Sequence, residues 1–367
     1  MHYKVPFVDI KKHYQSIKKE INTTLIDVLK RGDLILRKDL QEFEKNIARF
    51  VGTTYAVGVN SGFDALHLSV KAAGIGNGDE VITVGHTFVA TVAAIVHNGA
   101  RPVLIDVADD YNMDVALIEK NITKQTKAII PVHLNGRMCN MEAIQKIAQK
   151  YKLIIIEDAA QALGAQFLKK HAGAWGLTGC FSLYPFKLLG AFGDGGIVTT
   201  HNKIIAQKVR ELRDHGQNRV AGTITMYGFN ARLDNIQAAL LNTKFKYFKR
   251  WLARRKKIAQ TYYKGLKHIT EITLPHFNDP RYVDVYQNYV ITAEKRNSLK
   301  EFLTDNGVET LISWPKPMHH HKALQLSQFS LPKTEKVCKK VLSLPMNTEI
   351  EDSQIHYVID TIKKFYD

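Results

Sequence analysis

The sequence predicts an α/β fold with a mostly parallel central sheet, followed by a smaller α+β domain. Between residues 55 and 200, short β-branched runs alternate with stretches of helical periodicity. Near-continuous apolar strands separated by helices are typical of a parallel sheet that helices cover on both faces. Hydrophobic residues make up 45% of the 367-residue chain and charged residues 23%, values that exclude a disordered chain and a coiled-coil rod.

Seven runs in this region predict strands, and four stretches predict helices. The expected strands are residues 55–59, 81–84, 102–107, 127–132, 153–157, 180–183 and 196–200. The expected helices are residues 64–73, 87–97, 141–151 and 202–213. The helical stretches repeat apolar residues at helical spacing, whereas the strand runs are short and mostly rich in Val and Ile.

The C-terminal part of the chain has a different pattern. A basic helical stretch runs to about residue 266, and a loop-rich stretch with two prolines follows it. Beyond it we expect a strand at 289–292 and helices at 297–306, 333–341 and 352–365. We therefore expect a large α/β domain over residues 1–245, including the N-terminal segment, and a linker helix with a small α+β domain over 246–367.

Composition narrows the class of protein further. No apolar run reaches the ~18 to 20 residues of a membrane-spanning helix, and the first residues lack a signal-peptide core. The three cysteines are far apart and form no CxxC pair, which argues against a disulfide framework and a thiolate metal site. These features favour a cytoplasmic protein without a membrane partner.

The net charge of +16 is compatible with nucleic acid, a membrane surface or a small anionic substrate. The densest basic cluster, residues 244–257, also carries aromatic residues at mixed helical spacing. That arrangement favours a solvated or interface helix face over a nucleic-acid site. We expect no nucleic-acid partner.

Residues 59–66 combine a strand end, a tight turn and a helix start. The free N–H groups of a helix N-terminus can hold a phosphate, although Ser and Gly before a helix are more often a plain helix cap. Neither GxxxxGK[ST] nor GxGxxG occurs in the chain, so ATP hydrolysis and Rossmann dinucleotide binding lose support.

Asp158 follows an apolar run, where open α/β sheets place ligand chemistry. Burying this carboxylate requires a cation, either a protonated pyridine nitrogen or a basic side chain. Lys187 stands between aromatic residues and a glycine-rich turn. It is either an exposed lysine or, in an enclosed site, an amine whose lowered pKa suits Schiff-base chemistry.

Three adjacent histidines, residues 319–321, suggest a metal site. Adjacent side chains point in different directions, and no acidic or cysteine partner has a recognisable spacing. We expect no metal.

Eight motifs taken together resemble the DegT/DnrJ/EryC1 family, which comprises pyridoxal-phosphate-dependent sugar aminotransferases of fold type I in the aspartate aminotransferase superfamily. The resemblance covers nearly the whole chain, in order. The motifs are NSGFDAL (60–66), GDEVI (78–82), TFVAT (87–91), PVHL (131–134), EDAAQ (157–161), FSLYPFK (181–187), GDGG (193–196) and GFNARLD (228–234).

The resemblance implies two catalytic residues and two contacts to the cofactor ring. Lys187 matches the lysine that binds the cofactor as a Schiff base and then moves the proton. Asp158 matches the carboxylate that pairs with the pyridinium nitrogen. Gln161 matches the contact to the ring hydroxyl, and Phe88 matches the residue stacked on the ring face.

The phosphate cup and the oligomeric state follow from the same resemblance. Gly62, the Phe63 backbone and Ser182 match the residues that bind the cofactor phosphate. Asn230 matches a residue that reaches this phosphate from the neighbouring subunit, which implies a homodimer with shared active sites.

Three residues depart from the family pattern: Phe63 replaces a Thr, Leu188 replaces an Asn after the lysine, and Gln287 replaces a His. The presence of Lys187 argues against the dehydratase branch of the family, in which a His stands at that position.

The implied reaction is amination of a nucleotide-linked ketosugar with L-glutamate as donor. The apolar Phe63 favours carbon 3 of a dTDP-linked 3-keto-6-deoxyhexose, unless its ring simply packs inside the helix start. The alternatives are carbon 4 of a dTDP- or UDP-linked 4-keto-6-deoxyhexose and a non-catalytic regulatory protein.

Overall fold

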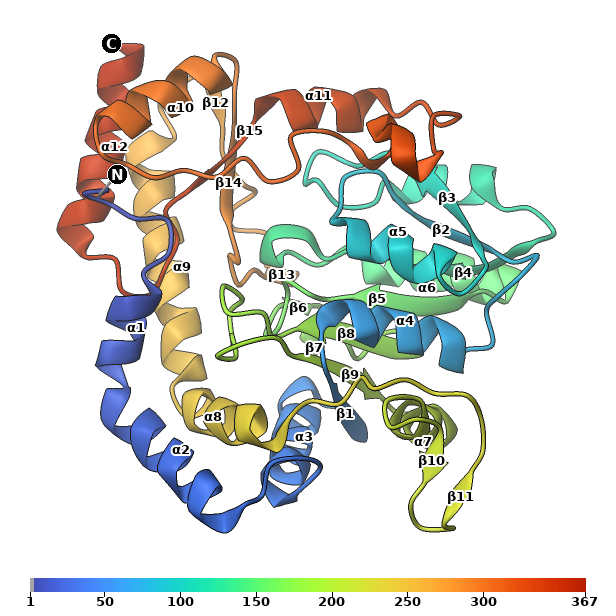
Figure 1. The fold of residues 1–367 in the computed structure, drawn as a ribbon. Coiled ribbons are helices and arrows are strands. Elements are labelled where there is room, and N and C mark those ends of the chain that lie inside the picture. Colours follow the sequence, from blue (N-terminus) through green and yellow to red (C-terminus); the bar gives the residue numbers. More distant parts are fainter. Residues whose placement is uncertain (1–2) are drawn as a thin grey trace.

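A seven-stranded sheet forms the centre of the computed structural model, which describes residues 3–367 (Figure 1). The strand order is β1-β9-β8-β5-β4-β2-β3. Only β9 runs opposite to the other six strands of this sheet. The expected mostly parallel α/β sheet is therefore confirmed. The bounds are β1 (Tyr55–Val59), β2 (Glu80–Val84), β3 (Arg101–Ile105), β4 (Thr126–Ile129), β5 (Ile154–Asp158), β8 (Thr178–Ser182) and β9 (Gly196–Thr200).

Both faces of this sheet are buried. Ile155 belongs to one hydrophobic core and the next residue, Ile156, belongs to another, as the alternation of side chains along a strand requires. This double burial explains the continuous apolar runs in the sequence. The helices that follow these strands are α4 (Gly62–Ala72), α5 (Val89–Val96), α6 (Met141–Tyr151) and α7 (Lys203–Leu212).

Three N-terminal helices, which the sequence analysis did not assign, precede the sheet: α1 (Ile10–Ser16), α2 (Lys18–Arg31) and α3 (Lys38–Val51). In α3, Leu40, Phe43 and Ile47 are buried at helical spacing. Both α2 and α3 pack against α8 (Asn235–Phe245). Charged residues dominate these helices and conceal their narrow apolar faces.

The basic stretch before residue 266 forms two helices, α8 and α9 (Phe248–Leu266). Phe245 and Phe248 stand on either side of the break and stack on each other with ring centroids 5.8 Å apart. Both rings also contact Phe50 of α3 edge-on. The long helix α9 runs from the first helices to the C-terminal part of the chain (Figure 1).

The C-terminal part has its own three-stranded antiparallel sheet, in the order β12-β14-β15. Its core includes Tyr262 of α9, Ile291 and Val358, and also Val5, which forms a β-bridge with Val308. Val5 lies in this core although the proposed boundaries put it in the large domain, and the two-domain division remains a proposal. The elements are β12 (Ile272–Thr273), β14 (Tyr289–Ala293), α10 (Arg296–Asp305), α11 (Pro332–Lys340), β15 (Val341–Leu344) and α12 (Asp352–Tyr366).

Short elements complete the fold. A second small sheet joins β13 (Tyr282–Val283), β6 (Gln166–Phe167) and β7 (Lys170–His171). A hairpin of β10 (Gln217–Asn218) and β11 (Thr223–Ile224) lies apart from the main sheet, at the lower right of Figure 1. The 3₁₀ turns are Val115–Leu117, Glu119–Asn121, Leu134–Gly136, Met318–His320 and Lys322–Leu324. Among residues 3–367, no helix is long and apolar enough to cross a bilayer.

Candidate active site

Asp158 is the last residue of β5 and is 5% exposed. Its Oδ2 accepts a 2.7 Å hydrogen bond from the hydroxyl of Thr91, and its Oδ1 accepts one of 3.2 Å from Ala160 N–H. Burial raises the pKa of Asp158, and the bond from Thr91 and the charge of Lys187 oppose that shift. The carboxylate is thus held in place at a site that favours a cationic neighbour.

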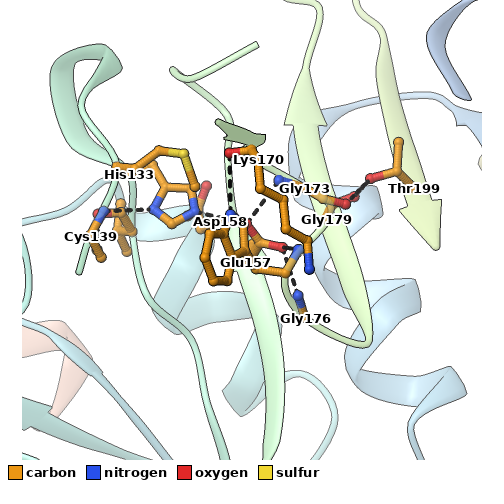
Figure 2. A network of polar contacts seen from close by, with 12 residues as sticks. His133, Cys139, Glu157, Asp158, Lys170, Gly173, Gly176, Gly179 and Thr199 are labelled. Atoms are coloured by element: carbon orange, nitrogen blue, oxygen red, sulfur yellow. Dashed lines mark hydrogen bonds and ion pairs between the residues drawn. The ribbon is translucent and has the colours of Figure 1, made fainter. Parts of the chain in front are cut away.

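The preceding residue, Glu157, is fully buried and has a different role (Figure 2). Its carboxylate accepts hydrogen bonds of 2.7 to 2.8 Å from the backbone N–H groups of Gly173, Trp175 and Gly176. His133 Nε2 lies 3.0 Å from the same carboxylate. Because Cys139 N–H donates to His133 Nδ1, the ring carries its proton on Nε2 and donates it to Glu157. Glu157 therefore fixes the loop between β7 and β8 and has no role left for a ligand.

Lys187 lies in the turn between β8 and β9, where its N–H donates to the carbonyl of Tyr184 at 2.8 Å. Its side chain lines a cavity of about 580 Å³. Desolvation lowers the pKa of Lys187 to about 8, and the charge of Asp158 opposes this shift. The fold thus supports the enclosed lysine and not the exposed alternative.

The same cavity brings together parts of the chain that are far apart in sequence. Gln161 lines it, with its Oε1 accepting a 2.7 Å hydrogen bond from Asn135 N–H. The remaining walls come from residues 7–13, from α9 and from the C-terminal part of the chain. A cavity of this size suits a small organic ligand.

Gly62 and Ser182 meet at the N-terminus of α4. A Cβ atom on Gly62 would lie 2.7 Å from Cβ of Ser182, so only glycine allows this approach. Ser61 caps the helix by accepting a 3.0 Å hydrogen bond from Asp64 N–H. The first N–H groups of α4 and the Ser182 hydroxyl can therefore face one anion together.

Phe63 packs along α4, and its ring is not part of the cavity lining. It stacks on His67 with ring centroids 5.6 Å apart and meets His97 edge-on at 5.7 Å. Its backbone N–H remains in the first turn of the helix. The ring thus adopts the packing alternative that the sequence left open.

Two residues that were expected to contact the cofactor, Phe88 and Asn230, do not line the cavity of Lys187 in the single chain. Phe88, the N-cap residue of α5, is 60% exposed. Asn230 is also exposed, and its backbone forms a β-bridge with Asp214. Their roles remain predictions.

Two of the basic residues between 244 and 257 are buried, so the expected solvated or interface face is wrong for them. Lys244 is 4% exposed and Arg255 is 8% exposed. Lys244 donates to the carbonyl of Gly190 and lies 4.8 Å from the ring centroid of Phe192. Both basic side chains line the cavity of Lys187, a position that their spacing along the helices does not reveal.

The motif TFVAT (87–91) contains Thr91, but the sequence did not indicate a role for it. Its hydroxyl lies 2.8 Å from that of Thr87 and donates to Asp158. Two threonines four residues apart at the start of an apolar helix were the available signal.

The expectation that no acid accompanies the histidines of residues 319–321 was wrong. Glu335 lies sixteen residues after His319, and its Oε1 is 3.0 Å from His319 Nε2 and 3.7 Å from His320 Nε2. These three side chains form the one potential metal-ligand group found in residues 3–367. The short contact is a hydrogen bond that already satisfies His319 Nε2 and Glu335.

The donor set suits pyridoxal phosphate. Lys187 offers an amine to an aldehyde, Asp158 offers a carboxylate to a ring nitrogen, and the start of α4 with Ser182 offers N–H and O–H groups to a phosphate. A lysine turn and a strand-end carboxylate on a mostly parallel seven-stranded sheet define the class of fold type I pyridoxal-phosphate-dependent enzymes.

Comparisons with known proteins agree with this class. The profile of the DegT/DnrJ/EryC1/StrS aminotransferase family matches residues 15–363. The chain is 38% identical over 99% of its length to the dTDP-3-amino-3,4,6-trideoxy-alpha-D-glucose transaminase of Streptomyces venezuelae, of which it covers 96%. It is 40% identical to a "pleiotropic regulatory protein" of Geobacillus stearothermophilus, with 99% of this chain and 98% of that protein covered.

A solved structure extends the likeness to three dimensions. The crystal structure of S. venezuelae DesV in complex with a ketimine intermediate matches with a TM-score of 0.96 and 37% identity, covering 100% of this chain and 99% of that one. The chain belongs to the DegT/DnrJ/EryC1/StrS aminotransferase family. It is a pyridoxal-phosphate-dependent sugar aminotransferase.

Proposed function

We propose that this enzyme aminates carbon 3 of a dTDP-linked 3-keto-6-deoxyhexose, with L-glutamate as the amino donor. The observation that carries the proposal is the enclosed side chain of Lys187, which lines a cavity of about 580 Å³ and whose pKa responds to the nearby charge of Asp158. The name of the S. venezuelae relative, a 3-amino sugar transaminase, supports the sugar class and the carbon atom.

Lys187 and Asp158 are the proposed catalytic residues. Bound pyridoxal phosphate would withdraw electrons from the carbon atom that gains or loses the amino group. With a pKa of about 8, the amine of Lys187 has a sizeable neutral fraction near neutral pH and can accept a proton at Nζ. Thr91 and Ala160 N–H orient the carboxylate of Asp158 and favour its charged form.

The other proposed contacts hold the cofactor. Gly62 and Phe63 would donate backbone N–H groups to its phosphate, and Ser182 would donate its hydroxyl. Gln161 would contact the ring hydroxyl from the cavity wall, and Phe88 would cover the ring face with its exposed side chain.

The proposed homodimer shares its active sites through Asn230. The support is an exposed apolar stretch beside it: Val220 is fully exposed, Ile224 is 76% exposed and Tyr227 is 97% exposed. A second copy of the chain would cover these side chains. We also propose a cytoplasmic location, which three buried cysteines without a disulfide support.

The argument for carbon 3 rests on the relative and not on the ring of Phe63. Since Phe63 packs against His67 and His97, its side chain contributes volume outside the cavity. The remaining alternative is amination at carbon 4 of a dTDP- or UDP-linked sugar. Membership of the aminotransferase family argues against a non-catalytic regulatory protein, although the G. stearothermophilus relative carries a regulatory name.

One experiment tests the proposal. The purified enzyme is incubated with glutamate and either dTDP-linked 3-keto or 4-keto sugars, and NMR locates the new amino group. We expect amination at carbon 3, and a variant Lys187→Ala without turnover. Exclusive amination at carbon 4 would refute the assignment of the carbon atom, whereas full activity of Lys187→Ala would refute the mechanism.

A further inference from the structure

The turn that carries Lys187 is held by the side chain of Gln287, which lines the same cavity. Gln287 Nε2 donates a 2.9 Å hydrogen bond to the carbonyl of Phe186, and Gln287 Oε1 accepts one of 2.9 Å from Leu188 N–H. These two backbone groups belong to the residues directly before and directly after Lys187. The amide of Gln287, itself 7% exposed, thus spans the lysine.

The backbone of Gln287 is fixed in turn by the C-terminal part of the protein. Gln287 lies two residues before β14 begins. Arg255 of α9 donates from one guanidinium nitrogen to the carbonyls of Tyr286 and Gln287, at 2.9 and 3.2 Å. A chain of contacts therefore runs from a buried arginine of the cavity wall through Gln287 to the lysine turn.

Two of the departures from the family pattern meet at this point. The side chain of Leu188 is 7% exposed and apolar, so it offers no hydrogen bond to the turn. Gln287 supplies both bonds instead. An apolar replacement of Gln287 would leave Leu188 N–H without a partner in a buried position, where an unmet donor is costly.

We infer that Gln287 is a positioning residue for Lys187: it fixes the backbone on both sides of the lysine and so sets where Nζ lies in the cavity. The inference rests on the proposed catalytic role of Lys187. Gln287 acts through the lysine turn, and the structure assigns it no contact to the reacting atoms.

The chain offers a matched control in Gln237 of α8. Its Oε1 accepts a 3.0 Å hydrogen bond from Phe192 N–H, and its Nε2 donates a 3.0 Å bond to the carbonyl of Phe192. The residue type is the same, and both glutamines bond one backbone N–H and one carbonyl of the turn between β8 and β9. Gln237 is half-buried and bonds both groups of a single residue, Phe192, which lies five residues beyond Lys187, so it does not bridge the lysine.

The test compares Gln287→Met with Gln237→Met in the holoenzyme. Cofactor content, Tm, kcat, KM and the pH titration of the visible absorption band are measured for both variants. For Gln287→Met we expect bound cofactor, a KM for the ketosugar within about twofold of wild type and a kcat lower by ~10- to 100-fold, since small displacements of reacting groups are costly. We also expect a higher pH midpoint of the visible band, because a loosened turn admits water to Nζ.

Gln237→Met should retain the wild-type midpoint and a kcat within about threefold of wild type. If Gln287→Met does not fold, Gln287→Asn takes its place in the test. Its side chain is polar but too short to span both backbone groups, so we expect the same losses. A wild-type midpoint and kcat in a folded Gln287 variant would overturn the inference, and so would equal losses in Gln237→Met.

Failure of the proposed function has a different signature. If wild type aminates no ketosugar, or if Lys187→Ala retains the visible band and turnover, the role of Lys187 itself is wrong. If wild type is active and Lys187→Ala is not, the Gln287 variants test positioning alone.

Discussion

Replacing Thr91 by Val removes the only side-chain hydrogen bond that Asp158 receives within residues 3–367. The two side chains have nearly the same shape, so the change affects polarity more than packing. A hydrogen bond to a charged group contributes roughly 1.5 to 3 kcal/mol, and about 1.4 kcal/mol corresponds to one pKa unit. Without this hydrogen bond the charged form is less favourable, so the pKa of Asp158, which burial already raises, should rise further.

The sign of the effect on activity follows directly. Asp158 acts as a carboxylate in the proposed mechanism, so a higher pKa removes the active form as the pH falls. The acidic limb of the pH profile of kcat/KM should move to higher pH in Thr91→Val, while the alkaline limb stays in place. The profile, measured from pH 5 to 9 with the ketosugar and glutamate, is the assay.

Thr87→Val provides the control. The Thr87 hydroxyl lies 2.8 Å from that of Thr91 and makes no hydrogen bond to Asp158 in the described chain. Its acidic limb should move less than that of Thr91→Val. An unchanged acidic limb in Thr91→Val, with cofactor bound, would refute the argument that the Thr91 hydroxyl stabilises the charge of Asp158.

Three further predictions concern stability, assembly and metal. In the cofactor-free protein, Lys187→Met should raise the free energy of unfolding at pH 7 by about 1 to 3 kcal/mol. Burial lowers the pKa of Lys187 to about 8, so below that pH the charged amine destabilises the folded state, and Met removes this cost. The gain should fade as the pH rises from about 8 past the ordinary lysine value, and denaturant titrations showing no gain at pH 7 would contradict the burial argument. Mixing inactive Asn230→Ala with inactive Lys187→Ala should restore part of the activity, because a mixed dimer contains one site without either lesion; no recovery despite subunit exchange measured by mass spectrometry would count against a shared site. Because His319 Nε2 already bonds Glu335, EDTA should leave Tm unchanged, and a Tm that falls with EDTA and returns with Zn²⁺ would reveal a bound metal.

The sheet could be predicted from the sequence because its strands carry their own signal. The runs at 55–59 and 196–200 match β1 and β9 at both ends, and the helix at 141–151 matches α6. Strands buried on both faces must be continuously apolar, and that pattern is local. The two-residue strands, such as β6 and β13, contain too few residues for any periodicity.

The contacts between side chains in the site could not be predicted, because the residues that make them are far apart in the sequence. Thr91 and Asp158 are 67 positions apart, and Gln287 and Leu188 are 99 apart. Such pairs form only through tertiary packing, so the motifs indicated Lys187 and Asp158 but not the side chains that hold them. The burial of Lys244 and the pairing of His319 with Glu335 were hidden in the same way.

The bridge between Val5 and Val308 has a consequence for the order in which the protein is built. Val5 N–H donates to the carbonyl of Gly307, and Glu309 N–H donates to the carbonyl of Val5. Phe7 and His13, which line the cavity, are held by the carboxylates of Glu309 and Glu349. Residues 5–13 are synthesised first and their partners near the end, so this part of the cavity wall stays without its partners during most of translation. The central sheet precedes these partners in the chain, and the cavity wall of residues 7–13 can be complete only after Glu349 has been synthesised.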